Sequence, residues 1–157
     1  MPNLLTLDLS ENKITSLKGL CDFPTLQTLK LNFNQIVEFD VVPELPALQN
    51  LDLTGNKIAS DKQIAKFTGL TALENLNMLE TPLAEEKGDD LRKEIIIALD
   101  HLPWKYINGE EIEESQITEA KEEKEERRKA AEEAEKERLA ELAAEEERKR
   151  AEAENAE

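Results

Sequence analysis

Apolar residues recur in one fixed pattern along the first half of the chain. The spacing Leu-x-x-Leu-x-Leu-x-x-Asn-x-Ile occurs three times, and each copy starts 22 residues after the last, at Leu4, Leu26 and Leu48. A fourth, more divergent copy runs from Leu73 to Leu83, with Thr81 in place of the asparagine. Because self-similarity at a fixed period is typical of repeat architectures, we predict one structural unit per copy.

Each copy predicts a short strand followed by a turn. Alternating leucines place their side chains on one face of the strand, and the asparagine amide can bond backbone groups where the chain bends away. Strands of successive copies then stack into one parallel sheet, and the return segments form the convex side. The longest of these, residues 60–71, is expected to contain one or two helical turns with Ile64, Ala65 and Phe67 available for burial. Since no copy can bury its leucines alone, stability should come from contacts between neighbours.

The segments after the repeats predict a closed C-terminal end. A helix is expected from Asp89 or Asp90 to about Leu99. Residues 102–109 then add a last extended rung, in which the only tryptophan and the only tyrosine, Trp104 and Tyr106, should cover the open edge of the core. The inward side chains of the helix are predicted to be Leu91, Ile95, Ile96 and Leu99.

The N-terminal end of the repeats is predicted to be open. Residues 1–4 align with the middle of a repeat, and no polar capping element precedes them. Repeat proteins need such caps for solubility. We therefore expect either that the chain belongs to a longer array, or that another protein covers Leu4, Leu7, Leu9 and the edge of the first strand.

The composition changes sharply at Glu110. Residues 110–157 hold twenty glutamates against ten lysines and arginines, a net charge of −10, whereas residues 1–109 carry sixteen acids against ten bases, a net charge of −6. This change predicts two domains, residues 1–109 and residues 110–157. The fold class that follows is α/β: a solenoid with a parallel sheet of about four to five rungs, a C-terminal cap helix and a long charged helix.

The tail from about residue 117 to 153 has the composition of a solvated helix. It contains no glycine or proline, and acids precede bases by four residues at five places, each worth about 0.2–0.5 kcal/mol. These pairs are Glu123 with Arg127, Glu125 with Lys129, Glu132 with Lys136, Glu145 with Lys149, and Glu146 with Arg150. A single solvated helix is favoured, while pairing with a partner helix around residues 131–143 and disorder are the alternatives.

Composition and motifs argue against several classes of function. Because both parts of the chain are acidic, nucleic acid and acidic membranes are poor partners. Cys21 is the only cysteine and His101 the only histidine, so neither an intramolecular disulfide nor a Cys/His metal motif can be built. No phosphate-binding, dinucleotide or nucleophile motif occurs, and no signal peptide or membrane span is evident. We predict a non-enzymatic cytoplasmic protein without cofactors.

The candidate interaction residues lie on three surfaces. These are the open first strand, the outward side of the sheet with its small polar side chains, and the tail helix; Phe33 could be an aromatic anchor at the groove edge or a core residue. Other protein subunits of a larger assembly are the expected partners. The candidates are Leu4, Leu5, Thr6, Asp8, Thr28, Lys30, Phe33, Asn50, Asp52, Asn77, Leu139 and Leu142.

The repeats resemble the compact leucine-rich repeats of the phosphatase-regulator type, which many ciliary proteins share. The run from Leu79 to Glu86, the helix after it, residues 102–111 and the charged helix together resemble the leucine-rich-repeat subunit of axonemal radial spokes. This resemblance implies a structural subunit of a cilium or flagellum, although Thr81 departs from the asparagine usual in that family. The alternatives are a dynein-associated or dynein-regulatory-complex subunit, and a phosphatase-regulatory protein.

Overall fold

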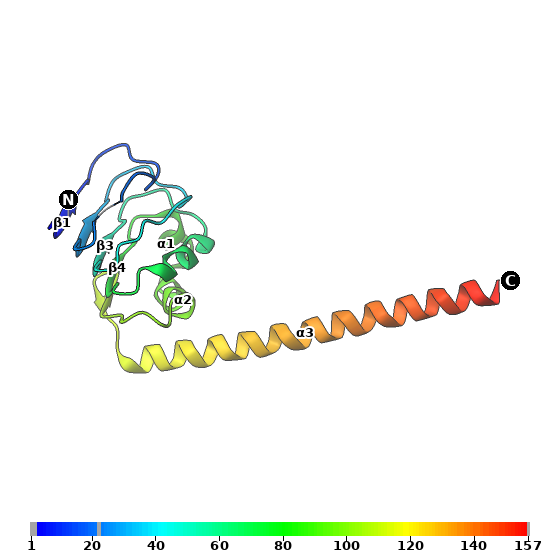
Figure 1. Ribbon diagram of the computed structural model, residues 1–157. Helices are drawn as coiled ribbons and strands as arrows, with labels where there is room; N and C mark the ends of the chain where they lie inside the picture. Colours follow the sequence, from blue (N-terminus) through cyan, green and yellow to red (C-terminus); the bar gives the residue numbers. More distant parts are fainter. Residues whose placement is uncertain (1–2, 22, 157) are drawn as a thin grey trace. The chain divides into compact units, whose positions relative to one another are not determined.

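The computed structural model describes residues 3–21 and 23–156, and it is built around a single sheet (Figure 1). Six strands follow one another in chain order; β1 to β5 run parallel, and β6 pairs antiparallel with β5. The strands are β1 (Thr6–Asp8), β2 (Thr28–Lys30), β3 (Asn50–Asp52), β4 (Asn75–Asn77), β5 (Tyr106–Ile107) and β6 (Glu110–Glu111). The predicted parallel solenoid is confirmed, and the expected repeat start at residues 1–2 lies outside the described residues.

The strands stack with their repeat positions in exact register. One apolar residue of each strand lies opposite its counterpart in the next: Leu7, Leu29, Leu51, Leu76 and Ile107. All of these except Leu7 are buried. Since side chains alternate along a strand, the neighbouring positions point to the other face of the sheet. The core therefore lies on one side of the sheet, and a polar surface lies on the other.

Three short helices occupy the return segments, on the core side of the sheet (Figure 1): η1 (Asp61–Gly69), α1 (Pro82–Lys87) and α2 (Asp90–Ala98). η1 confirms the expected helical turns, and its Phe67 ring packs edge-on against Phe39 with centroids 4.8 Å apart. Ala65, however, is exposed rather than buried, because only Gln63, Ile64 and Phe67 of η1 face the core. The helix α2 buries every side chain predicted to point inward from it.

Helix α1 was not predicted, and it explains the substitution of asparagine by Thr81. The Thr81 hydroxyl accepts a hydrogen bond from the Ala84 amide at 3.1 Å, which caps the first turn of the helix. The same hydroxyl donates to the Met78 carbonyl at 2.8 Å. Thr81 thus bonds the carbonyl three residues earlier, as the repeat asparagines do, and starts a helix as well.

The C-terminal closure is partly as predicted. Trp104 is buried and its indole nitrogen donates to the Leu99 carbonyl at 2.9 Å. Tyr106 does not cover the core edge, since its side chain points to the outward face and is 46% exposed. Ile107 fills the position inside the core instead, and the later residues Ile112 and Ala120 are buried against the same cluster.

The sheet ends in a tight hairpin. Asn108 and Gly109 connect β5 to β6, and both have positive φ, +53° and +78°. A two-residue loop with both residues in this region is the turn that matches the twist of paired strands, and Asn-Gly is its preferred sequence. The direction of the chain therefore reverses at the last strand of the sheet, and the edge strand β6 carries two exposed glutamates, Glu110 and Glu111.

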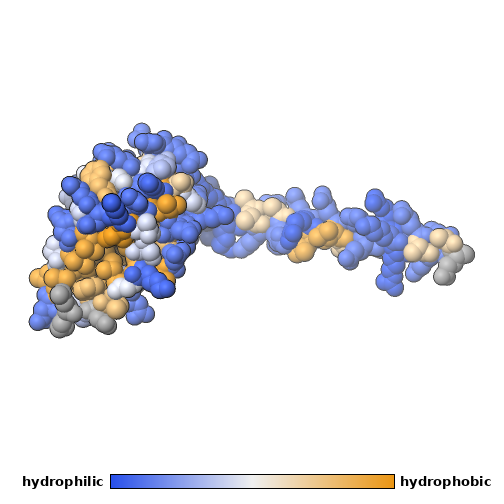
Figure 2. Space-filling model, turned by 90° about the horizontal axis from the view of Figure 1, so that it is seen from above, coloured by the Kyte–Doolittle hydropathy of each residue, from blue (hydrophilic) through white to orange (hydrophobic). Residues whose placement is uncertain are grey.

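The first repeat is less well covered than the others. Leu4, Leu7, Leu9 and Ile14 are only partly buried, whereas their counterparts in the second repeat are fully buried. Leu5 is exposed. Figure 2 shows hydrophobic residues exposed over part of the repeat unit's surface. The expected exposure of the first repeat is thus present in the described residues.

The chain divides into two compact units, Met1–Ala120 and Lys121–Glu157. The helix α3 (Glu114–Asn155) begins within the first unit and supplies nearly all of the second. Three of the five predicted ion pairs are present: Glu123 with Arg127, Glu125 with Lys129, and Glu145 with Lys149. Glu132 pairs with Arg128, and Arg150 with Glu154. The prediction of a long charged helix is confirmed.

Buried asparagines tie the second and third repeats to the repeats before them. Asn56 is 2% exposed, and its side-chain nitrogen donates to Leu53 in its own repeat and to Leu31 in the preceding repeat, both at 2.9 Å. Its side-chain oxygen accepts from the Ile36 amide at 3.2 Å. Asn34 repeats this arrangement one repeat earlier. At each of these two junctions, one side chain therefore satisfies three backbone groups.

Replacing Asn56 with alanine is expected to lower the free energy of unfolding by about 2–3 kcal/mol, because buried backbone groups lose their partners. The matched control is Asn12→Ala, because Asn12 is the equivalent asparagine of the first repeat. Asn12 is exposed, so water can replace the hydrogen bonds that its side chain loses. We expect a loss below about 1 kcal/mol there. Urea unfolding followed by Trp104 fluorescence measures both, and equal losses would contradict the proposed role of the junction.

Candidate functional site

The outward face of the sheet carries two rows of polar side chains, which we call the concave face. The register places Thr6, Thr28, Asn50, Asn75 and Tyr106 in the first row. It places Asp8, Lys30, Asp52 and Asn77 in the second. Consecutive strands thus bring seven of the candidate residues together: Thr6, Asp8, Thr28, Lys30, Asn50, Asp52 and Asn77. This is the largest group of predicted site residues that the structure assembles.

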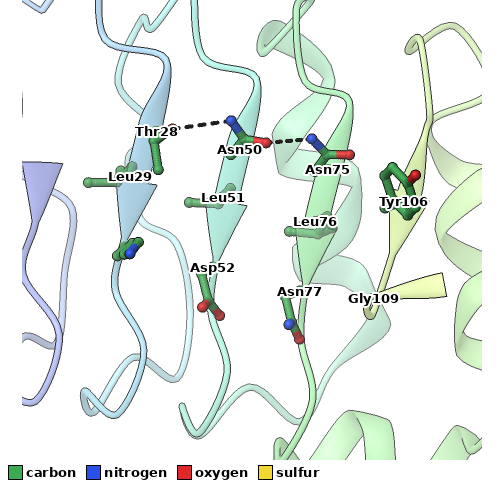
Figure 3. A pocket seen from close by; sticks show the side chains of 11 residues that line it. Thr28, Leu29, Asn50, Leu51, Asp52, Asn75, Leu76, Asn77, Tyr106 and Gly109 are labelled. Atoms are coloured by element: carbon green, nitrogen blue, oxygen red, sulfur yellow. Dashed lines mark hydrogen bonds between the residues drawn. The ribbon is translucent and has the colours of Figure 1, made fainter. Parts of the chain in front are cut away.

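The first row is linked by side-chain hydrogen bonds (Figure 3). Asn75 donates through its side-chain nitrogen to the oxygen of Asn50, and Asn50 donates to the Thr28 hydroxyl at 3.1 Å. The remaining oxygen of Asn75 is buried without a hydrogen-bond partner in the described part of the chain. Both asparagine amides donate toward β2. The side-chain oxygen of Asn75 is therefore the acceptor at the other end of this chain of bonds, on the strand next to Tyr106.

The second row alternates charge across adjacent strands. Asp8, Lys30 and Asp52 are aligned in register, and Asp52 also accepts a hydrogen bond from the Thr54 amide at 3.0 Å. The corresponding bond to Asp8 comes from the Ser10 amide at 3.0 Å, and the Ser10 hydroxyl donates to the same oxygen at 2.5 Å. The Ser10 hydroxyl and amide, together with the Lys30 charge, lower the pKa of Asp8 below its ordinary value.

A shallow hollow of about 270 Å³ opens between the two rows. It is lined by both rows from β2 to β4 and closed at one side by Tyr106 and Gly109 (Figure 3). Asn75 and Tyr106 were not among the predicted site residues. The repeat alignment gave Asn75 the same outward position as Asn50, so that residue could have been found, whereas the aromatic pattern suggested a core role for Tyr106.

The other candidates are not among the residues that form this face. Phe33 follows β2 at the edge of the sheet and is 47% exposed, so it is an edge residue rather than a core residue. Leu4 is half-buried and Leu5 is exposed, both just before β1. Leu139 and Leu142 are exposed on α3 in the second compact unit. Binding by any of these residues stays a prediction.

The chemistry available on these surfaces is that of polar recognition. Among the described residues, no group of three or more His, Cys, Asp or Glu side chains is placed so that it could hold a metal ion. In the same part of the chain, no helix combines the length and apolar character needed to cross a bilayer. The concave face offers amide, hydroxyl and carboxylate groups together with one aromatic ring, which suits a protein surface as ligand.

The chain belongs to the leucine-rich repeat family, whose model matches residues 3–143. No curated protein matches the sequence. Among solved structures, it is similar to a chain of the Drosophila melanogaster SNF/U2A' complex, with a TM-score of 0.65 and 27% identity over 74% of this chain and 66% of that one. The chain thus spans just under two thirds of its structural relative.

A more distant similarity is to a chain of the Chaetomium Mex67:Mtr2 subunits. That TM-score is 0.45, with 22% identity over 61% of this chain and 62% of the other.

Replacing Gly55 with alanine should destabilise the repeat unit. Gly55 has a φ of +72°, which L-residues adopt at a cost of about 1–2 kcal/mol, and a methyl group there would lie 2.7 Å from Cε1 of Phe33. The share of this destabilisation that comes from the clash with the Phe33 ring should disappear when Phe33 is also replaced by alanine. In a urea-unfolding cycle, Gly55→Ala should therefore cost less in a Phe33→Ala background than in the parent chain. Additive losses would show that the ring does not press on this glycine.

The Asp8 carboxyl group should titrate with a pKa below the ordinary value of an aspartate side chain. A folded-state pKa below the unfolded one stabilises the fold at pH values above the unfolded pKa, and that contribution is lost as the pH falls through the folded-state pKa. Replacing Ser10 with alanine removes the hydroxyl, the largest cause, so the Asp8 pKa should rise toward the ordinary value. Carbon-detected NMR titration of the carboxyl group measures both, and an unchanged pKa in Ser10→Ala contradicts this assignment.

Proposed function

We propose that the protein is a non-enzymatic interaction scaffold that binds another protein on its concave face. The observation that carries the proposal is the pair of aligned polar rows, which form an open surface around the hollow bordered by Tyr106. Small side chains leave the backbone of the sheet approachable, and a half-exposed tyrosine is a residue type enriched at binding hot spots. The similarity to a chain crystallised in a two-protein complex adds support.

A narrower proposal is that the assembly is an axonemal radial spoke in a cilium or flagellum. It is supported by the resemblance of the cap segment and charged helix to the leucine-rich-repeat subunit of spokes. A dynein-associated or dynein-regulatory-complex subunit shares the repeats, and a phosphatase-regulatory protein would use the same face. The small side chains of the first row, Thr6, Thr28, Asn50 and Asn75, favour a structural partner over one that needs large anchoring residues.

Affinity capture with the full chain tests both levels of the proposal. The bait variant Lys30→Glu reverses one charge at the centre of the concave face, and Lys62→Glu makes the same change on η1, away from that face. We expect Lys30→Glu and Tyr106→Ala each to reduce partner recovery at least about tenfold, and Lys62→Glu to leave it unchanged. Equal recovery with all baits would exclude the concave face as the binding surface.

The identity of the captured proteins decides the narrower question. Salt-extracted axonemes and a cytoplasmic extract serve as separate sources. Recovery of spoke components from axonemes would support the spoke assignment. Recovery of dynein or regulatory-complex subunits, or of a phosphatase catalytic subunit, would replace it while leaving the scaffold role intact.

A further inference from the structure

A second surface lies along the edge of the sheet, where each strand turns away. One repeat position there has positive φ in all four repeats: Glu11 (+55°), Phe33 (+57°), Gly55 (+72°) and Glu80 (+55°). The backbone amides of the first three residues each donate a hydrogen bond of 2.8–2.9 Å to a carbonyl of the following repeat. Glu11 donates to Asn32, Phe33 to Thr54, and Gly55 to Leu79. These four residues therefore form one row across four repeats, separate from the concave face.

Phe33 is an unusual occupant of this row. A bulky side chain at positive φ is conformationally strained, and strain of this kind is retained mainly where surrounding contacts or function require it. The ring gains little burial in return, since it is 47% exposed. It lies across Gly55, the one residue of the row without a side chain, with ring atoms 2.7 and 3.2 Å from the position of a Cβ there.

Leu79 is an exposed apolar residue of the fourth repeat, and it also lines a hollow with Ala84 and Arg92. Its carbonyl accepts the hydrogen bond from Gly55, and its side chain is 44% exposed although the equivalent residues Ser10, Asn32 and Thr54 are polar. We call Phe33, Gly55 and Leu79 the edge strip. Its three residues come from consecutive repeats, and the two apolar side chains, Phe33 and Leu79, are both exposed.

The edge strip has a carboxylate at each end. Glu11 and Glu80 are both exposed, and neither makes an ion pair among the described residues. They stand three repeats apart in the row, which at the strand spacing of a sheet is about 14 Å. Four residues of an extended chain span about 13 Å. A basic residue at each end of such a segment would match both carboxylates, and a central apolar residue would meet the edge strip.

We propose that the edge strip binds an extended segment of a partner protein in which one apolar residue stands between two basic residues, with the sequence pattern Lys/Arg-x-apolar-x-Lys/Arg. The apolar residue contacts Phe33 and Leu79 across Gly55, and the two cations pair with Glu11 and Glu80. The acidic net charge of −16 favours the approach of such a segment to the chain as a whole. This site goes beyond the concave face and can exist without it.

The test uses the ¹⁵N-labelled full chain and two synthetic peptides, Lys-Thr-Leu-Thr-Lys and Glu-Thr-Leu-Thr-Glu, both with blocked ends. Titration with the lysine peptide should shift the backbone amide signals of Phe33, Gly55 and Leu79, and the glutamate peptide should not. The affinity for the lysine peptide should fall at least about fivefold in Phe33→Gly and in the double variant Glu11→Gln/Glu80→Gln. The charge control is Glu38→Gln/Glu44→Gln, which neutralises two exposed acids on the return after the second repeat.

Phe33→Gly is expected to fold, because glycine already occupies this position in the third repeat and tolerates positive φ. Its thermal unfolding and its spectrum outside the strip verify this, and the glutamine pair provides a second variant with the backbone untouched. Equal shifts with both peptides, shifts confined to the concave face, or unchanged affinity in both variants would overturn the proposal. None of these outcomes depends on the affinity-capture experiment with the Lys30→Glu and Tyr106→Ala baits, so the two proposals can fail separately.

Discussion

The fold depends on the bonding of backbone groups at the junction between adjacent repeats. Short strands of two or three residues give few ladder hydrogen bonds, so the turns after them must be satisfied in another way. The buried amides of Asn34 and Asn56 do this, and each reaches the carbonyl of the preceding repeat as well as its own. These side chains thus help to fix the register of each repeat against its neighbour. The rows of the concave face are aligned as a consequence of that register.

Much of this arrangement could be predicted because repetition reveals register. Once Leu4, Leu26 and Leu48 are recognised as equivalent, every intervening residue acquires a face, and Thr28 and Asn50 become neighbours without any knowledge of the structure. The tail could be predicted for a different reason, since strong helix formers and acid–base pairs at helical spacing act locally.

Two of the failures occur where the repeat pattern ends. Tyr106 was expected to cover the core because aromatic residues usually do, but the strand alternation gives the inner position to Ile107. In the sequence, Thr81 looks like a loss of the repeat asparagine. Its role as the cap of α1 depends on the following Pro82 and on the tertiary packing of Leu83. The strain at Phe33 was not detectable, since positive φ at its repeat position is evident only from the backbone.

The hairpin at Asn108 and Gly109 has a consequence for assembly. Reversal of the chain puts two glutamates on the final edge strand, and like charges there oppose the addition of another strand. Pairing of a further strand beside β6 is therefore electrostatically unfavourable.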